Sequence, residues 1–322
     1  RLSSVVAFSL GALILSLTGA GPALAGGLFL YEVGTADVGL ASAGYSARAQ
    51  DASTVLTNPA GMTLLEGKQV LLGTQVLYTD PSFSIDSGTS PALGTANGGN
   101  PIGFFAGGSG FYTQKLSPKL SVGFGLAGNF GLALEYNDGW AGRYYADKAT
   151  LLGVSLLPSI AYQITDELSV GVSLNAMYGI TDVKVAVNNI TGPDGGLKVK
   201  DETWGWGGNV GVMYQISPST RLGLTYTSKV DLDFSANAEF SGLAPGLEAL
   251  LGSRGLLNAP LDIGITVPQT LMASLFTQLD PKWALLASAG WQDWSEFGRV
   301  DISVDSNNPR SLTTDAPFKD TW

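Results

Sequence analysis

The chain has 322 residues, a formal net charge of -10, no cysteine and no histidine. These absences exclude a Ser-His-Asp triad, a Cys-His nucleophile, zinc sites built on imidazole or thiolate, and disulfides. The acidic balance argues against nucleic acid as a partner, and a charged fraction of only 14%, against roughly 25% in soluble domains, is typical of a membrane protein.

The first 25 residues have the features of a secretory signal peptide. An apolar segment from Leu2 to Leu17 follows Arg1 and leads to Ala23-x-Ala25, whose small residues suit cleavage by signal peptidase. We therefore expect residues 1–25 to be removed and the mature chain to begin at Gly26. The alternative is a membrane-anchoring helix, for which the apolar core is short. Both interpretations predict export from the cytoplasm.

Residues 26–66 do not alternate between apolar and polar residues. They are rich in Gly, Ala and Ser, contain one short stretch that is compatible with a helix, and are too few for a domain with its own core. We predict that they fold as a plug, or hatch, inside a barrel. In Asn58-Pro59-Ala60-Gly61 the Asn side chain can bond local backbone and Pro fixes a bend, although an ordinary loop turn fits these residues equally well.

Residues 67–322 show the two-residue periodicity of β-strands. In 119–130 one face carries apolar residues, whereas the other carries Gly, Ser, Ala and Asn with few charges. Beyond the N-terminus no apolar stretch is long enough for a spanning helix, and a closed barrel is the other structure that satisfies its backbone inside lipid. The sequence therefore predicts an all-β protein, a transmembrane antiparallel β-barrel. The residues expected to face lipid in this strand are Leu120, Val122, Phe124, Leu126 and Phe130.

Short turns and long loops alternate along the barrel region, as in outer-membrane barrels with short periplasmic turns. Long connections are expected at 79–103, 131–151, 181–203, 233–267 and 296–319. Tight turns are expected at Ser117-Pro118, Thr165-Asp166-Glu167, Ser217-Pro218-Ser219 and Asp280-Pro281. Aromatic residues near the strand ends predict interfacial girdles, namely Tyr78, Trp140, Tyr144, Tyr145, Trp204, Trp206, Trp283, Trp291 and Trp294.

The strand count is about nine before Glu296, with a tenth beginning near Lys319. Because single-chain bacterial barrels have an even number of strands, and because the last residues do not alternate, we expect a C-terminal truncation. A complete ten-stranded barrel is the alternative.

The loop at 233–267 contains an apolar helical pattern. Leucines follow at i, i+4, i+7 and i+8 as one face of a short helix that ends near Gly252, namely Leu243, Leu247, Leu250 and Leu251. On an outer loop such a face needs a partner, which is either a hydrophobic ligand or the other loops.

Several motifs occur in a fixed order along the exported chain. They are Gly27-Leu28-Phe29-Leu30-Tyr31-Glu32, Asp51-Ala52-Ser53-Thr54, Asn58-Pro59-Ala60-Gly61, Glu135-Tyr136-Asn137-Asp138-x-Trp140-Ala141-Gly142, Gly205-x-Gly207-x-Asn209-x-Gly211, Leu224-Thr225-Tyr226-x-Ser228, Trp294-Ser295-x-Phe297 and Phe318-Lys319-Asp320. This ordered set resembles the FadL family of outer-membrane transporters of long-chain fatty acids and hydrocarbons. The resemblance implies fourteen strands around an N-terminal hatch, of which about nine or ten are present here, and ligand capture between the outer loops.

The resemblance also suggests site residues. It places Asn58, Pro59, Ala60 and Gly61 in the hatch, and it implies a kink for sideways release in the third strand, at Gly128 and at Asn129, Phe130 and Gly131. The positions of the family's basic ligand residues match Ile180 and Asp301 here. Lys184, Arg299 and Arg143 are the candidate partners for a ligand carboxylate. This departure favours an uncharged hydrocarbon over a fatty acid.

These features predict passive transport of hydrophobic small molecules across the outer membrane by a monomer that contacts lipid and lipopolysaccharide. We expect no enzymatic activity, no cofactor, no metal and no nucleic acid partner. A general diffusion porin or a structural outer-membrane barrel is the alternative. An enzyme would need chemistry without His or Cys, and a secreted β-sandwich would carry more Lys and Glu on its strands.

Overall fold

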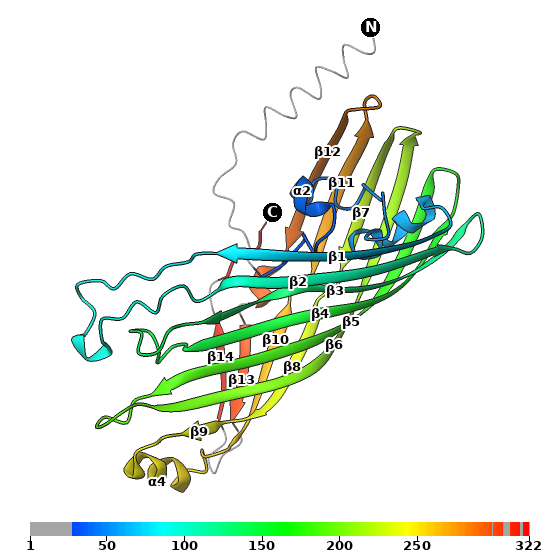
Figure 1. Ribbon diagram of the computed structural model, residues 1–322. Helices are drawn as coiled ribbons and strands as arrows, with labels where there is room; N and C mark the ends of the chain where they lie inside the picture. The colour runs from blue at the N-terminus through cyan, green and yellow to red at the C-terminus, as the bar shows by residue number, and fades with distance from the viewer. Residues whose placement is uncertain (1–27, 298, 305–309, 316–317, 322) are drawn as a thin grey trace.

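The computed structural model describes residues 28–297, 299–304, 310–315 and 318–321, so the predicted signal peptide lies outside the described residues. The chain forms a long antiparallel sheet that curls into a half-barrel (Figure 1) in the order β1-β2-β3-β4-β5-β6-β7-β11-β12. Its strands are β1 (Lys68–Thr79), β2 (Gly103–Lys115), β3 (Leu120–Glu135), β4 (Lys148–Gln163), β5 (Leu168–Val187), β6 (Gly195–Ser217), β7 (Thr220–Thr227), β11 (Thr270–Gln278) and β12 (Ala284–Gln292). The all-β antiparallel prediction is confirmed, and the path has the nine strands expected before Glu296.

The tight turns lie where the sequence predicts them, but two of the long loops are shorter. β5 and β6 pair in unbroken register as far as Val187 and Gly195, so the expected loop 181–203 contracts to 188–194. β3 and β4 likewise pair as far as Glu135 and Lys148. The reason is that the alternation of side chains continues through these stretches. Val183 and Val185 lie on one face of β5, and Asp182 and Lys184 lie on the other. The charged residues of the strand led to its interpretation as a loop.

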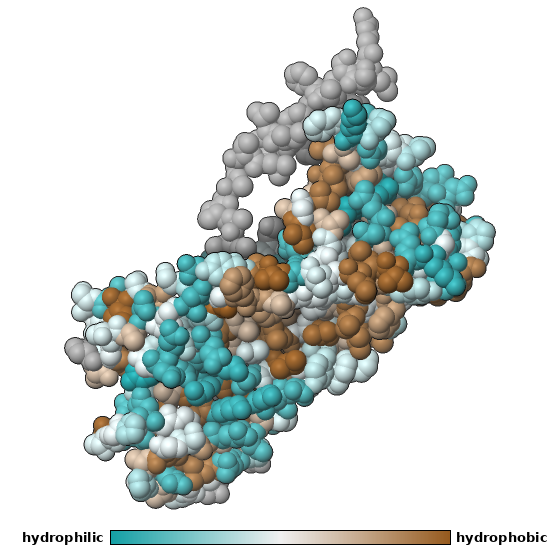
Figure 2. Space-filling model, in the orientation of Figure 1, coloured by the Kyte–Doolittle hydropathy of each residue, from teal (hydrophilic) through white to brown (hydrophobic). Residues whose placement is uncertain are grey.

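The outer face of the half-barrel is apolar and exposed. Phe124 and Leu126 of β3, Leu174 of β5 and Trp206 and Val210 of β6 are all more than two-fifths exposed. Figure 2 shows hydrophobic side chains gathered across the middle of this face, with hydrophilic side chains toward the loop end. A face of this size does not occur on soluble monomers, and it suits a wall that contacts hydrocarbon.

A second, four-stranded sheet has the order β14-β13-β10-β8 and packs against the inner face of the half-barrel. It comprises β8 (Val230–Asn237), β10 (Pro260–Val267), β13 (Arg299–Val304) and β14 (Arg310–Asp315), while β9 (Glu239–Ser241) pairs with β6. Leu232 and Phe234 of β8 lie over Gly179, and Val230 lies over Gly205. The regions 233–267 and 296–319, expected as loops, therefore contain strands. Charged residues at alternate positions of β8, such as Asp231 and Asp233, led to its interpretation as a loop.

The N-terminal segment, defined as residues 28–66, lies on the concave face near the short turns (Figure 1). It contains α2 (Asp37–Leu40), α3 (Thr54–Thr57) and η2 (Pro59–Leu64). Val55, Leu56 and Met62 pack with Phe111 and Leu157 of the wall into a buried cluster. None of the helices in the described part of the chain has the length and hydropathy needed to span a bilayer.

Strand β3 has an irregularity at the level of the N-terminal segment. The register with β4 shifts between Gly128 and Phe130, so Asn129 is an extra residue in the strand. The shift turns Phe130 to the inside, where it is 2% exposed, and the prediction that Phe130 faces lipid with Leu126 is wrong. A bulge reverses the alternation of side chains, which a periodicity argument cannot detect without knowing its position.

Two aromatic residues expected in the girdles are buried instead. Trp140 stacks on Tyr136 at a ring distance of 3.7 Å and donates from its indole nitrogen to the carbonyl oxygen of Ala146, so it fixes its own loop. Trp294, in α5 (Trp294–Phe297), is 2% exposed and packs among inner aromatic rings. Their predicted interfacial role is wrong.

Candidate functional site

Glycines on the inner wall let the backbone of the N-terminal segment approach closely. A Cβ atom at Gly211 of β6 would lie 2.0 Å from Oδ1 of Asn58, and one at Gly171 of β5 would lie 2.4 Å from the nitrogen of Ala60. Both glycines occupy positions that face the concave side. Asn58, Pro59, Ala60 and Gly61 are all buried against these two strands.

The side chain of Asn58 joins the N-terminal segment to the wall. Its amide nitrogen donates to the carbonyl oxygens of Ser46 at 2.7 Å and of Val212 in β6 at 3.1 Å, and its oxygen accepts from the nitrogen of Ala60 at 3.1 Å. The side chain is fully buried, and its three hydrogen bonds satisfy both ends of the amide.

Further hydrogen bonds hold the segment around its circumference. Ser109 of β2 donates to the carbonyl oxygen of Val33 at 2.6 Å, and Thr225 of β7 donates to that of Thr57 at 3.0 Å. The Nε atom of Arg221 in β7 donates to the carbonyl oxygen of Ala47 at 2.5 Å. Because these contacts come from β2 and β7, which are well separated in the sheet, the segment is held against the wall at several points.

A buried ion pair closes the loop between α2 and α3. The guanidinium of Arg48 contacts the carboxylate of Asp37 at 2.7 Å, with side chains 3% and 1% exposed. Thr35 donates a second hydrogen bond to the same carboxylate at 2.8 Å. The pair carries no net charge into the interior, and it fixes the loop that contains Tyr45.

The start of the N-terminal segment pairs with the irregular part of β3. Leu30 donates its backbone N–H to the carbonyl oxygen of Asn129 at 2.9 Å, and Gly131 donates to the carbonyl oxygen of Leu28 at 2.7 Å. Phe29 and Phe130 thus form an isolated antiparallel bridge. The irregularity frees backbone groups of β3, and residues 28–30 satisfy two of them.

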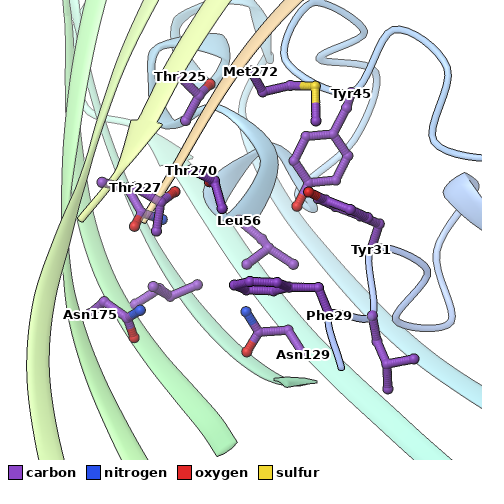
Figure 3. Close-up of a pocket in the computed structure, with 13 residues that line it drawn as sticks. Phe29, Tyr31, Tyr45, Leu56, Asn129, Asn175, Thr225, Thr227, Thr270 and Met272 are labelled. Atoms are coloured by element: carbon purple, nitrogen blue, oxygen red, sulfur yellow. The ribbon is translucent and has the colours of Figure 1, made fainter. Parts of the chain in front are cut away.

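A narrow cavity of about 40 Å³ lies between the N-terminal segment and the inner wall. In Figure 3, Phe29, Tyr31, Tyr45 and Leu56 reach it from the N-terminal segment, opposite side chains of the strands. No residue that lines this cavity, within the described ranges, carries a formal charge. The wall contributes Asn129, Leu157, Asn175, Asn209, Thr225, Thr227, Thr270 and Met272.

The cavity is uncharged at neutral pH, since its ionisable hydroxyls stay protonated. Burial, opposed by the hydrogen bond from Gln292 and aided by the charge of Glu32, raises the pKa of Tyr31 to about 12. Burial likewise raises the pKa of Tyr45. Three buried amide oxygens, those of Asn129, Asn175 and Asn209, have no hydrogen-bond partner. Each such orphan costs about 1–3 kcal/mol unless something in the cavity bonds it.

The candidate carboxylate partners Arg143 and Lys184 lie far along the strands from this cavity, at the loop end. Both line a separate cleft of about 230 Å³, and each is paired there, Arg143 with Asp194 at 2.7 Å and Lys184 with Asp147 at 2.8 Å. The backbone of Arg299 belongs to β13. The geometry thus brings two of the three cations to one cleft, with acidic partners already in contact.

The hydrogen bonds of this cleft shift two pKa values. Burial alone would raise the pKa of Asp194, but hydrogen bonds from Arg143 and Tyr144 lower it below its usual value. The same contact with Asp194 raises the pKa of Arg143. The loop carrying Arg143 is therefore held to the 188–194 connection by a charge-assisted bond at neutral pH.

The leucines of the outer loop lie on and beside α4 (Pro245–Ser253). Leu243 precedes the helix and packs near Gly195, whereas Leu250 is 45% exposed. Helix α4 and β9 lie at the loop end of the molecule, away from the N-terminal segment (Figure 1). The structure therefore separates the leucine face from the cavity that contains Asn129.

Sequence reasoning missed most residues of the cavity. Asn209 was recognised only as part of a motif, and Asn175 was not singled out. The signal in the sequence was an amide side chain at an inward position of each of two strands, Asn175 in β5 and Asn209 in β6. Phe29 was seen only as part of a motif and Tyr45 was not singled out, because nothing local shows which side chains meet across the concave face.

The comparisons with known proteins agree with this geometry. The family model described as "Outer membrane protein transport protein (OMPP1/FadL/TodX)" matches residues 16–322. Outer membrane protein P1 of Haemophilus influenzae is 31% identical, over 90% of this chain and 70% of that protein. The long-chain fatty acid transport protein of Escherichia coli O6:H1 is 26% identical, over 92% of this chain and 72% of that protein.

A solved structure shows the same fold. The Ralstonia pickettii toluene transporter TbuX superposes with a TM-score of 0.68 and 19% identity, and the match covers 90% of this chain and 81% of that one. The chain is an outer-membrane β-barrel protein and belongs to the outer membrane protein transport protein family (OMPP1/FadL/TodX).

Proposed function

We propose that this protein carries uncharged hydrophobic small molecules across the outer membrane by passive diffusion, with the N-terminal segment as the hatch. The observation that carries the proposal is the uncharged cavity between that segment and the inner wall. The names of two similar proteins, a long-chain fatty acid transport protein and a toluene transporter, support the substrate class. No chemical step is needed, because a series of apolar sites suffices for downhill movement.

Aromatic rings lead from the cavity toward the irregular part of β3. The ring of Tyr45 lies 5.1 Å from that of Tyr31, and Phe29 lies 5.2 Å from Phe130 and 5.6 Å from Trp294. Edge-to-face contacts at these distances are favourable. Such a row offers a hydrophobic ligand successive partners of similar affinity.

The exit in this proposal is the irregularity at Asn129, Phe130 and Gly131. Residues 28–30 cover it through two backbone hydrogen bonds and the contact of Phe29 with Phe130. Two net hydrogen bonds correspond to about 1–3 kcal/mol, so a modest change in the N-terminal segment uncovers the wall at this point. The ligand then passes sideways into the bilayer, and the exposed apolar outer face contacts lipid and lipopolysaccharide.

Capture at the outer surface is assigned to the leucine face around α4. Leu250 is exposed, and a cavity of about 230 Å³ lies beside the helix with Leu243 and Leu257 in its lining. Leu247 and Leu251 are half-buried on the same helix. Packing among the loops accounts for part of this face, and ligand capture accounts for the exposed remainder.

The charge distribution favours an uncharged ligand over a fatty acid. Lys184 and Arg143 already have carboxylate partners, so binding a fatty acid there would require breaking an existing ion pair. The narrow cavity offers no cation to a carboxylate. We assign the working state as a monomer, in which all contacts to ligand come from one chain.

The test is uptake of labelled toluene and labelled oleate by cells that carry the full-length protein. We expect toluene uptake above that of cells without the protein, and weaker or absent oleate uptake. Small sugars that enter equally well with or without the N-terminal segment would instead identify a general porin.

A crosslink tests the sideways exit. Phe29 and Phe130 form a bridge without direct hydrogen bonds between them, which corresponds to a Cα separation of about 4.5 Å and suits a disulfide. Because the chain has no cysteine, the Phe29→Cys/Phe130→Cys protein has no competing thiol. We expect uptake to stop on oxidation and to return on reduction, whereas each single variant stays insensitive to oxidant. Undiminished uptake by the crosslinked protein would refute this exit.

A further inference from the structure

Three asparagines from three strands turn toward the same cavity. Asn129 lies in β3, Asn175 in β5 and Asn209 in β6, and all three line the space between the wall and the N-terminal segment. Asn175 and Asn209 are each 3% exposed. We call these residues the asparagine triad.

The triad lacks partners. The Oδ1 atoms of all three residues are buried and accept no hydrogen bond. Buried amides are nearly always bonded, so three of them around one cavity indicate a missing polar group. By contrast, the side chain of Asn58 in the N-terminal segment is equally buried and makes three hydrogen bonds.

The missing group must donate a hydrogen bond. An amide can turn its oxygen or its NH2 group toward the cavity, and a hydroxyl suits both because it donates one bond and accepts others. A carboxylate offers no donor and would be buried without a cation, and an ammonium would be buried without a carboxylate, since no lining residue is charged. A hydrocarbon leaves the oxygens unpaired.

The other side of the cavity suits an apolar body. Phe29, Leu56 and Met272 line the cavity together with Asn129 and Asn175 (Figure 3). The volume of about 40 Å³ is enough for a polar head group or for water, and is smaller than the roughly 150 Å³ cavity that holds benzene. A ligand ring therefore takes the place of the Phe29 ring, which already has aromatic neighbours in Phe130 and Trp294.

We propose that the asparagine triad binds the hydroxyl group of an uncharged, otherwise apolar ligand, so that the protein prefers a phenol to the hydrocarbon of the same shape. This inference rests on the proposed function, because it identifies the ligand class of the same cavity. The phenol enters neutral, since a phenolic hydroxyl has a pKa near 10. Its ring takes the place of the Phe29 ring, and its hydroxyl forms hydrogen bonds with Asn175 and Asn209.

The test compares three ligands of one shape, p-cresol, toluene and p-toluate, by calorimetric binding to the purified full-length protein and by uptake into cells. We expect p-cresol to bind about 3- to 10-fold more tightly than toluene for each hydrogen bond that its hydroxyl gains. p-Toluate should bind more weakly than both. A fourth ligand, 1-octanol, separates an aromatic from an aliphatic source of the hydroxyl, and we expect it to bind more weakly than p-cresol.

Two variants connect the preference to the triad. Asn175→Leu and Asn209→Leu should each reduce the affinity for p-cresol about 3- to 10-fold while the affinity for toluene stays equal or rises. Asn237→Leu, at an exposed position of β8, is the matched control and should change neither. Heat-modifiable migration on gels verifies that each barrel is folded, and toluene binding verifies that the cavity is intact.

The outcomes separate this inference from the proposed function. Equal binding of toluene and p-cresol to the wild-type protein, or an unchanged preference in both asparagine variants, overturns the inference and identifies water as the partner of the triad. In that case toluene uptake still stands. Absence of uptake for every ligand would instead overturn the proposed function.

Discussion

Replacing Asn58 with Ala should loosen the N-terminal segment from the wall without altering the barrel. The change removes three hydrogen bonds, to Ser46, Val212 and Ala60, from a fully buried position. Only the bond to Val212 reaches the wall, because Ser46 and Ala60 belong to the N-terminal segment itself. At about 0.5–1.5 kcal/mol, the loss of that bond weakens docking directly, and the loss of the other two loosens the fold of the segment. The loss of the wall bond corresponds to a rise of about 2- to 13-fold in the ratio of undocked to docked segment.

The assay is the conductance of single proteins in planar bilayers, together with swelling of liposomes in small sugars. An undocked segment opens a water-filled passage, so Asn58→Ala should show frequent open events and faster swelling. Ser46→Ala is the matched control, because the Ser46 hydroxyl is buried without a partner and the carbonyl that accepts from Asn58 is retained. Equal conductance of the two variants, whether low or high, would refute the reasoning.

Three further predictions follow from single contacts. Gly223→Ala places a Cβ atom 1.8 Å from a backbone oxygen of the N-terminal segment, so the segment should become cleavable by added protease while the barrel stays heat-modifiable. Arg48→Met leaves Asp37 buried without its partner and should destabilise the docked segment by about 3–5 kcal/mol, measured as earlier thermal release of that segment to protease. The pKa of Asp194 is lowered, so its contact with Arg143 contributes stability at neutral pH that is lost as the pH falls below about 4. A spin label on an introduced cysteine at position 139 should therefore gain mobility only below about pH 4, and Asp194→Asn should show that mobility already at pH 7.

The wall of the barrel could be predicted from the sequence because its information is local. Alternation in β3 placed Leu126 outside, and the turn residues Ser117-Pro118 placed the end of its hairpin. A strand that contacts lipid on one face and a packed interior on the other has to alternate, so its pattern is strong.

The features that depend on contacts between distant segments could not be predicted in the same way. Phe130 was placed on the wrong face because a single extra residue, Asn129, reverses the alternation. β8 was mistaken for a loop although it alternates, because the sequence does not show that a second sheet packs inside the wall. The unpaired amides of Asn175 and Asn209 are visible only when the cavity is known, since a polar residue on an inner face has many possible partners.

The plug and the cavity depend on one another through the inner face of β6. Asn209 and Gly211 both face inside, one strand repeat apart. At Gly211 the absent side chain admits Asn58, which anchors the N-terminal segment, whereas Asn209 lines the cavity and its amide oxygen has no hydrogen-bond partner. The anchoring of Asn58 at Gly211 therefore holds Leu56 over the cavity at Asn209. For this reason a change that loosens Asn58 should also weaken ligand binding at the asparagine triad, although none of its atoms lines the cavity.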